Sequence, residues 1–351
     1  MAGERKLWLD FGKGCSMVLV LLFHCEMYSP FGDTSLSSLF TLFRMPFFFF
    51  LSGFLFTADP QHFSLRRKLK QILRGIVWTY LLFATAITIP KYLISGEPLS
   101  EGFENLLLGY ASWFVVALGG SQVLFALLLR WCKRKWVYVL FMIASLLLGW
   151  GEKALGMGRL PYCFDSTLVV NFYFGLGMFY RWNETRVNKR LKDSWSNLVL
   201  LAVVFFVLTW FDRCYLHTCE ALFNVLDFTN FPLAVAYSLI GIAMMTIFSK
   251  KFCQPRWIRF VGRNSLVFYY LNGGIAHAMV VLLSAVGLTA LFQQAAYPSA
   301  MRYVFLFFLL LCVALTISLI AWAIRRYAPL LIGDKESFNR MAVRLGLSIR
   351  F

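Results

Sequence analysis

Continuous runs of apolar residues, separated by short polar segments, dominate the pattern along the chain. A membrane-spanning helix needs about 20 mostly apolar residues, and ten runs come near that length. Because the runs are continuous and do not alternate, they predict helices and exclude the strands of a transmembrane barrel. The predicted spans are residues 7–28, 38–57, 70–95, 112–131, 135–151, 166–181, 195–211, 231–249, 264–287 and 302–324. Residues 98–111 are a candidate for a further re-entrant or interfacial piece.

The composition agrees with a membrane location. Of 351 residues, 60% are hydrophobic, 15% are charged and 37 are phenylalanine, whereas soluble domains are about 45–50% apolar and about 25% charged. These values exclude a disordered chain or a disulfide-stapled module and disfavour a soluble two-domain enzyme. The eight cysteines include no C-x-x-C pair, so no zinc or thioredoxin-type site is indicated. We predict an all-α integral membrane protein, with a bundle of about ten transmembrane helices at residues 1–330 and a short cytoplasmic tail at 331–351.

The charge is strongly basic, with 34 Lys and Arg against 17 Asp and Glu, giving +17. In a soluble protein this would indicate nucleic acid as a partner, but no such motif is present and the charges lie between the apolar runs. In membrane proteins Lys and Arg accumulate in cytoplasmic loops. One alternating set of segments holds 27 of the 34 basic residues, which predicts that both termini are cytoplasmic. These segments are 1–6, 58–74, 130–135, 181–192, 250–263 and 325–351.

The first predicted span carries three ionisable side chains, Asp10, Lys13 and His24. Such groups are costly inside a membrane and usually functional. Around a helix, Lys13 and His24 lie within about 20° of each other, and Asp10 within about 40° of His24. All three share one face, with Lys13 near the cytoplasm and His24 about 16 Å farther along, in the outer half. The structural alternative makes Asp10 and Lys13 interfacial anchors and His24 a hydrogen-bonded packing residue.

The second predicted span runs back toward the cytoplasm and contains Arg44, Pro46, Ser52 and Gly53. Arg44 and His24 lie at similar distances from the outer ends of their spans, so we expect them at similar depth. Pro46 frees a backbone carbonyl, and Ser52-Gly53 allows a close helix approach. A packing kink is the alternative interpretation of Pro46 and Gly53.

A dense basic segment, from His62 to Arg74, follows the second span. It is able to hold several phosphates, with a cytoplasmic charge signal alone as the alternative. Three later features are weaker: Trp113, Asp165 at the start of the sixth span, and the run Gly262-Arg263-Asn264-Ser265. Trp113 is also typical of a membrane interface, and Asp165 of a helix N-cap.

Taken in order, these segments resemble the membrane acyltransferase 3 family. Residues 8–14 lead to His24 in the family's pattern of a basic residue, ten intervening residues and a histidine. Residues 43–53 are close to its Met-Pro-x-Phe-Phe…Ser-Gly signature. The basic segment, Trp113-Phe114, Pro161 to Asp165, and Gly262 to Leu266 follow in the family's order. The resemblance covers residues 6–275 and is closest to the branch of fucose-4-O-acetylase-like and exopolysaccharide acetyltransferases.

The resemblance implies a membrane-bound O-acyltransferase of the bacterial cytoplasmic (inner) membrane. Its donor would be cytoplasmic acetyl-CoA or another acyl-CoA, and its acceptor a sugar hydroxyl of a carbohydrate or lipid-linked glycan that is exported or carried on the cell surface. Membrane lipids are further partners, and no bound cofactor, metal or nucleic acid is expected. His24 suits the catalytic base that a weakly nucleophilic hydroxyl needs, and Arg44 suits oxyanion stabilisation or acceptor binding. The candidate substrate-binding residues are Asp10, Lys13, Ser52, Arg66, Arg67, Lys70, Arg74, Trp113 and Asp165.

Three departures from the family pattern leave alternatives open. The family's Arg-x-x-Arg is Arg67-Lys68-Leu69-Lys70, a common proline is Gly75, and a common histidine on the ninth span is Asn272. Direct transfer and an acyl-histidine relay both fit the residues. A transporter or lipid-linked glycan flippase is the alternative function, although no inverted repeat with paired broken helices is evident.

Overall fold

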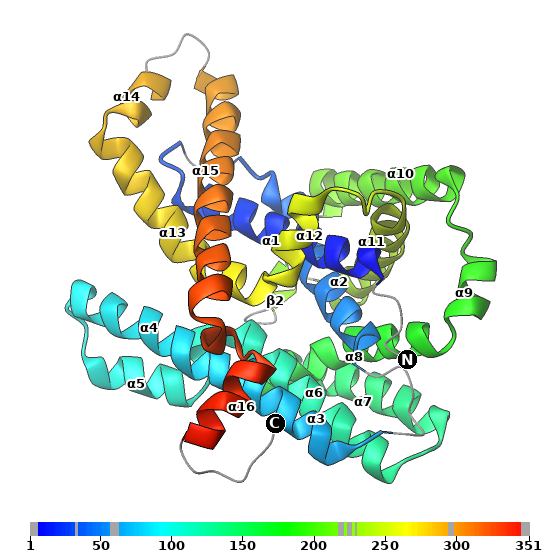
Figure 1. The fold of residues 1–351 in the computed structure, drawn as a ribbon. Coiled ribbons are helices and arrows are strands. Elements are labelled where there is room, and N and C mark those ends of the chain that lie inside the picture. Colours follow the sequence, from blue (N-terminus) through cyan, green and yellow to red (C-terminus); the bar gives the residue numbers. More distant parts are fainter. Residues whose placement is uncertain are drawn as a thin grey trace.

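The chain folds almost entirely into helices in the computed structural model, which describes residues 6–31, 34–56, 63–216, 221–222, 227–228, 230–293 and 298–344 (Figure 1). One two-stranded antiparallel ladder pairs β1 (Ala221–Leu222) with β2 (Asp227–Phe228). The helices are α1 (Leu7–Tyr28), α2 (Thr41–Phe54), α3 (Leu65–Ile72), α4 (Trp78–Ser95), α5 (Leu99–Leu107), α6 (Trp113–Trp131), α7 (Lys135–Ala154), α8 (Phe164–Trp182), α9 (Glu184–Arg190), α10 (Trp195–Phe211), α11 (Phe231–Lys251), α12 (Arg256–Arg263), α13 (Ser265–Ala285), α14 (Leu288–Gln293), α15 (Pro298–Tyr327) and α16 (Lys335–Arg344).

The prediction of an all-helical membrane protein with about ten spans is confirmed. Within the described ranges, nine helical stretches are long and apolar enough to cross a membrane. They are Leu7–Tyr28, Ser37–Phe54, Leu65–Ser95, Tyr110–Trp131, Lys135–Ala154, Trp195–Tyr215, Phe231–Lys251, Ser265–Ala285 and Ala300–Tyr327. The tenth expected span, at residues 166–181, is the 19-residue helix α8.

Helix α8 is more polar than the nine spans. This is tolerated because its polar side chains face other helices. Asp165, Ser166, Thr167 and Asn171 are all buried, and α8 packs against α2, α6 and α7. The Asn171 side-chain amide donates to the Ser145 hydroxyl of α7 at 3.0 Å. A helix enclosed by protein can carry hydrogen-bonded polar groups that would be costly against lipid.

The third span is longer than predicted. A π-helical turn at Leu73–Val77 joins α3 to α4, so a helical stretch runs from Leu65 to Ser95, where the apolar pattern began it at residue 70. A π turn inserts an extra residue without ending the helix. Helix α3, which carries the basic side chains, is therefore part of the same continuous helix as the membrane span.

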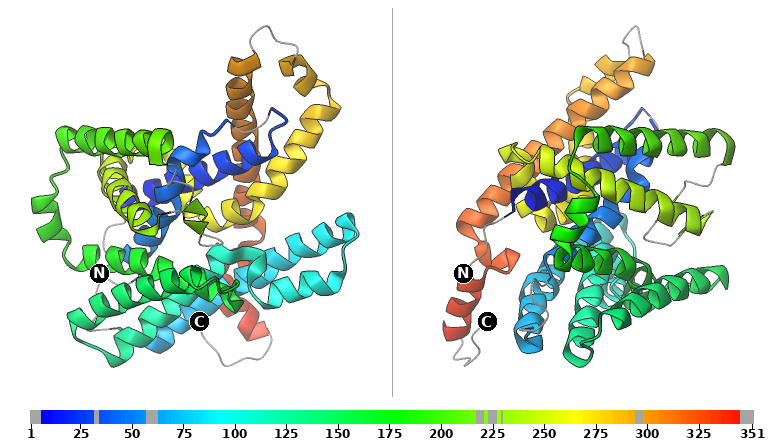
Figure 2. Two further views of the ribbon diagram at one scale, coloured as in Figure 1. Left: turned by 180° about the vertical axis from the view of Figure 1, so that it is seen from behind. Right: turned by 90° about the vertical axis from the view of Figure 1, so that its right-hand side faces the viewer.

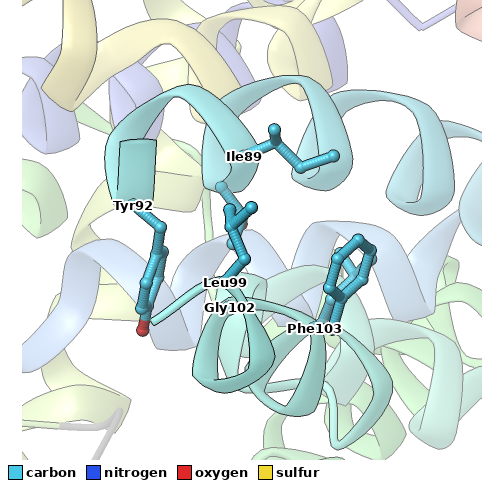
Figure 3. Close-up of a pocket in the computed structure, with 7 residues that line it drawn as sticks. Ile89, Tyr92, Leu99, Gly102 and Phe103 are labelled. Carbon is cyan, nitrogen blue, oxygen red and sulfur yellow. The ribbon is translucent and has the colours of Figure 1, made fainter. Parts of the chain in front are cut away.

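The candidate segment 98–111 is helical and folds back along the third span. Figures 1 and 2 show α5 beside α4, and Tyr80 of α4 donates to the carbonyl of Leu106 at 2.6 Å. In Figure 3, Ile89 and Tyr92 of α4 face Leu99 and Phe103 of α5 across a cavity of about 10 Å³. This cavity is barely large enough for one water molecule, so α4 and α5 form one packed hairpin.

Above α4 and α5 in Figure 1, α13 and α15 pack along each other, and both contact α14. The chain then turns at Gly333, whose φ of 69° lies in the left-handed region, and α16 packs against the start of α4. The Trp78 indole donates to the Leu330 carbonyl at 3.0 Å, and the Phe338 ring lies 5.1 Å from the Trp78 ring. The tail expected at residues 331–351 thus includes a helix that docks on the third span.

Two pairs of glycines hold the centre of the bundle at backbone contact. A Cβ atom added at Gly53 of α2 would overlap the carbonyl oxygen of Phe174 of α8, and one at Gly177 of α8 would overlap the carbonyl oxygen of Phe50. The same reciprocity joins α1 to α12, through Gly14 and Gly262. Small residues at such crossings are how membrane helices pack closely without a hydrophobic driving force.

We expect Gly177→Ala to destabilise the protein, because the new methyl group would displace the backbone of α2. Overpacking of this kind costs about 1–3 kcal/mol or more, and the thermal unfolding midpoint in detergent should fall accordingly. Gly151→Ala in α7 is the matched control, because nothing lies within 4 Å of the added Cβ. Equal midpoints for the two variants would contradict the packing account.

Candidate active site

His24 lies in the C-terminal part of α1, and its backbone neighbour sets its tautomer. The Nδ1 atom is 2.9 Å from the carbonyl oxygen of Val20, one turn earlier. A carbonyl only accepts, so Nδ1 carries the proton of the neutral ring. Nε2 then holds the lone pair, as a general base requires.

Arg44 is brought next to His24 by the antiparallel packing of α1 and α2. The guanidinium lies 4.5 Å from the centroid of the Phe23 ring, and its charge acts electrostatically on His24. Arg44 is buried, and its Nη1 atom has no hydrogen-bond partner among the described residues. The structure therefore places a buried cation with an unused donor beside the histidine.

Glu26 organises this end of the site and was missed in the sequence analysis. Its carboxylate accepts the backbone N–H groups of Leu36 and Ser37, each at 3.0 Å, and the hydroxyl of Thr34. It thereby fixes the connection from α1 to α2, and its charge also acts on Arg44. The available signal was an acidic residue two positions after His24, inside the same predicted span.

The third wall of the site comes from α13. A Cβ atom added at Gly273 would lie 3.3 Å from Cδ2 of His24, so the ring packs against this glycine. One turn farther, the His277 ring lies 5.2 Å from that of Tyr28 on α1. Asn272 stands where the family often has a histidine; it is buried, and its Nδ2 has no hydrogen-bond partner among the described residues.

At the opposite end of α1, Asp10 forms an ion pair with Arg263. The Arg263 Nε and Asp10 Oδ2 atoms are 3.0 Å apart, and Arg325 of α15 donates to the Arg263 carbonyl at 3.1 Å. Gly262 permits this pairing, because it lets α12 lie directly against the backbone of α1. The run at residues 262–265 therefore ties α12 to α1 and α15.

Helix α3 distributes the basic segment over different faces. Lys68 points inward: its Nζ donates to the Phe56 carbonyl at 2.9 Å and lies 4.0 Å from the Phe56 ring. Lys13, whose Nζ is 5.3 Å from the Phe48 ring, repels Lys68 electrostatically. Arg67 is exposed on the first turn of α3. Lys68 is thus a second cation near Lys13 that was not among the sequence candidates.

The other three basic candidates of this segment lie away from the Lys13–Lys68 pair. Arg66 and Lys70, one turn apart, line an open groove between α3 and α6. Arg74 interacts electrostatically with Asp334, just before α16. The Asp334 carboxylate accepts the Ser337 N–H at 3.0 Å, and this bond, with the Arg74 charge, keeps the pKa of Asp334 below its ordinary value.

The remaining candidates occupy separate positions in the bundle. Ser52 of α2 is buried, and Trp113 at the start of α6 packs on Phe114, their ring centroids 6.1 Å apart. Asp165 is buried in the first turn of α8 and not at its N-cap, which is Cys163. In the part of the chain that the structure describes, no group of three or more His, Cys, Asp or Glu side chains is placed to hold a metal ion.

The fold and the site define a polytopic helical membrane protein with a half-buried histidine and a buried arginine between three helices. A model of the acyltransferase 3 family, described as an acyltransferase domain, matches residues 6–322. Because the match covers nearly the whole chain, the protein belongs to this family and is a membrane acyltransferase. Comparisons with curated proteins and with solved structures give no significant match.

We expect Gly273→Ala to reduce acyltransferase turnover, because a methyl group 3.3 Å from the His24 ring forces the ring or the helix to move by a few tenths of an ångström. Since a misplacement of about 1 Å can cost 100-fold, a shift of this size should cost about threefold to tenfold. Gly274→Ala is the matched control: it makes the same change in the same helix, with nothing within 4 Å. Equal turnover per folded molecule in the two variants would show that α13 does not position His24.

Proposed function

We propose that this acyltransferase moves an acyl group, normally acetyl, from cytoplasmic acyl-CoA to a sugar hydroxyl of an exported or cell-surface glycan. The observation that carries the proposal is the 2.9 Å contact between Nδ1 of His24 and the Val20 carbonyl oxygen, which assigns the proton to Nδ1 and the lone pair to Nε2. The charge of the buried Arg44 acts on the same ring. A base and a cation together are what acyl transfer to a hydroxyl needs. The family match favours such transfer over the transporter alternative.

In this mechanism, Nε2 of His24 takes the proton of the sugar hydroxyl while the sugar oxygen bonds to the thioester carbon. The tetrahedral intermediate then collapses, the carbon–sulfur bond breaks, and His24 returns the proton to the departing CoA thiolate. The Val20 carbonyl holds the ring in one tautomer through both steps and stabilises the imidazolium that forms between them. The products are a sugar ester and free CoA.

Arg44 would stabilise the negative charge that develops on the carbonyl oxygen. Its burial makes the interaction strong, because little water screens it. Glu26 supplies a counter-charge on the far side, and three hydrogen bonds hold its carboxylate. The cation is therefore positioned before the reaction begins, which is the arrangement that electrostatic catalysis requires.

The CoA phosphates would bind at the cytoplasmic end of α1, between Lys13 and Lys68, with Arg67 nearby on α3. The two ammonium groups repel each other, and a bound anion would offset this repulsion. Met17 and Val20 lie on the same face of α1 as Lys13 and His24, and both are buried among apolar side chains. To bring the thioester to His24, the pantetheine arm would enter along this apolar face, which is packed with side chains in the structure.

The orientation that this route needs is the one that the loop charges favour. With both termini in the cytoplasm, Lys13 faces the CoA pool, and His24 and Arg44 lie in the outer half of the membrane. The enzyme would then reside in the bacterial cytoplasmic membrane and acylate its glycan from the outer side. Tyr28, which lies near Gly273 as His24 does, and His277, which packs on Tyr28, would be the first side chains that the acceptor meets.

We expect His24→Asn to lose at least about 100-fold in turnover per folded molecule, because base catalysis is worth about 10²–10⁴-fold. Asparagine keeps hydrogen-bonding capacity but cannot accept a proton at neutral pH. Acyl-CoA affinity, measured by calorimetry, should stay close to that of the parent because the cytoplasmic cations are intact. More than about a tenth of the parent turnover would leave His24 with a packing role only.

We expect Lys13→Ala and Lys68→Ala each to raise the KM for acyl-CoA more than they lower kcat, since phosphate anchoring is mostly uniform binding. The double variant should fall short of additivity, because the two cations hold one ligand. Lys189→Ala, at an exposed site on α9, is the charge-matched control. An unchanged KM in both single variants would remove the donor site from this end of α1.

A further inference from the structure

An open groove of about 530 Å³ lies between α3, the π turn that follows it, and α6. Its volume falls within the range of about 300–1,000 Å³ that small-ligand sites occupy. None of the eight described residues that line it is acidic, two are basic, and the rest are aliphatic. They are Leu65, Arg66, Leu69, Lys70, Ile72, Leu73, Val77 and Val123.

The cations and the aliphatic side chains occupy different levels along the helix. Arg66 and Lys70 stand one turn apart on the first two turns, whereas Leu73 and Val77 follow toward the membrane interior. The helical stretch Leu65–Ser95 has 31 residues, so it is about 46 Å long and exceeds a hydrocarbon core of about 30 Å. Its basic first turns therefore extend into the headgroup region.

The groove faces outward from the bundle. The side chains of Leu69, Leu73 and Val77, which line the groove, are exposed. On a membrane span, exposed aliphatic side chains face lipid chains. Lys68, two residues from both Arg66 and Lys70, points to the opposite side of α3, toward Phe56 and Lys13.

We propose that this groove binds an anionic phospholipid of the cytoplasmic leaflet. Its phosphate lies between Arg66 and Lys70, and one acyl chain lies along Leu69, Leu73 and Val77 against Val123. Basic pockets at the cytoplasmic ends of membrane helices are suited to acidic headgroups. A soluble CoA phosphate would gain nothing from the aliphatic half of the groove, which is continuous with the bilayer. The site is separate from the proposed donor site, on the other face of the same helix.

The test is native mass spectrometry of the full chain in detergent, titrated with phosphatidylglycerol or with phosphatidylcholine. The parent should retain phosphatidylglycerol preferentially. The double variant Arg66→Ala/Lys70→Ala should lose about fivefold or more in affinity for it, the effect of at least one interfacial cation. Leu73→Trp, which fills the groove without changing charge, should cause a similar loss.

Two matched controls decide whether the groove itself is responsible. Arg186→Ala/Arg190→Ala removes an exposed basic pair with the same spacing from α9, and Leu81→Trp enlarges a side chain that is 50% exposed on the same helical stretch, outside the groove. Both controls should retain phosphatidylglycerol like the parent. Equal losses of phosphatidylglycerol affinity in the test and control variants would show that the effect comes from net charge or side-chain size alone. That result would overturn the proposal.

The KM for acyl-CoA, measured in detergent without acidic lipid, separates the two phosphate sources. An unchanged KM in Arg66→Ala/Lys70→Ala, together with lost lipid retention, supports the lipid site. A raised KM with unchanged lipid retention would assign both side chains to the donor and overturn the proposal. Failure of the proposed sugar acylation would leave the lipid measurements unaffected, because they do not depend on turnover.

Discussion

Contact between helix backbones at paired glycines is the constraint on which the rest of the structure depends. Gly53 and Gly177 bring α2 against α8, and Gly14 and Gly262 bring α1 against α12, so that no side chain fits between the helices. Helices α1 and α2 also pack against each other, and His24 and Arg44 lie close together where they meet. The site is therefore built on rigid helices, which position catalytic groups better than loops do.

Three buried ionisable groups each have a neighbour that compensates their charge. Asp10 is paired with Arg263, Glu26 accepts three hydrogen bonds, and Arg44 has the Glu26 charge and the Phe23 ring near it. Each group is costly in a low-dielectric interior unless a partner compensates it. His24 is held by a backbone carbonyl, which fixes its tautomer without adding a second charge. The Asp10–Arg263 ion pair at one end of α1 is thereby separate from the His24–Arg44 pair at the other.

The sequence was sufficient for the helical class, nearly every span, the shared face of Asp10, Lys13 and His24, and the family. Long apolar runs and helical periodicity are local signals, which explains this success. Partners distant in sequence left no such signal: the Asp10–Arg263 pair, the turn held by Glu26, and the placement of Gly273 against His24 all depend on tertiary packing. The basic segment was predicted as one cationic site, but α3 turns Lys68 inward and Arg66 and Lys70 outward, because consecutive residues of a helix point in different directions.

In the proposed mechanism, the continuity of helix α1 bears on how substrates on opposite sides of a membrane would react. Lys13 and His24 lie on one continuous helix, and α12 packs against its backbone at Gly14 and Gly262. In the proposed mechanism, a donor anchored at one end and an acceptor arriving at the other would be joined by this one helix. Such a mechanism would not require the whole bundle to alternate between inward-open and outward-open shapes, as a transporter does.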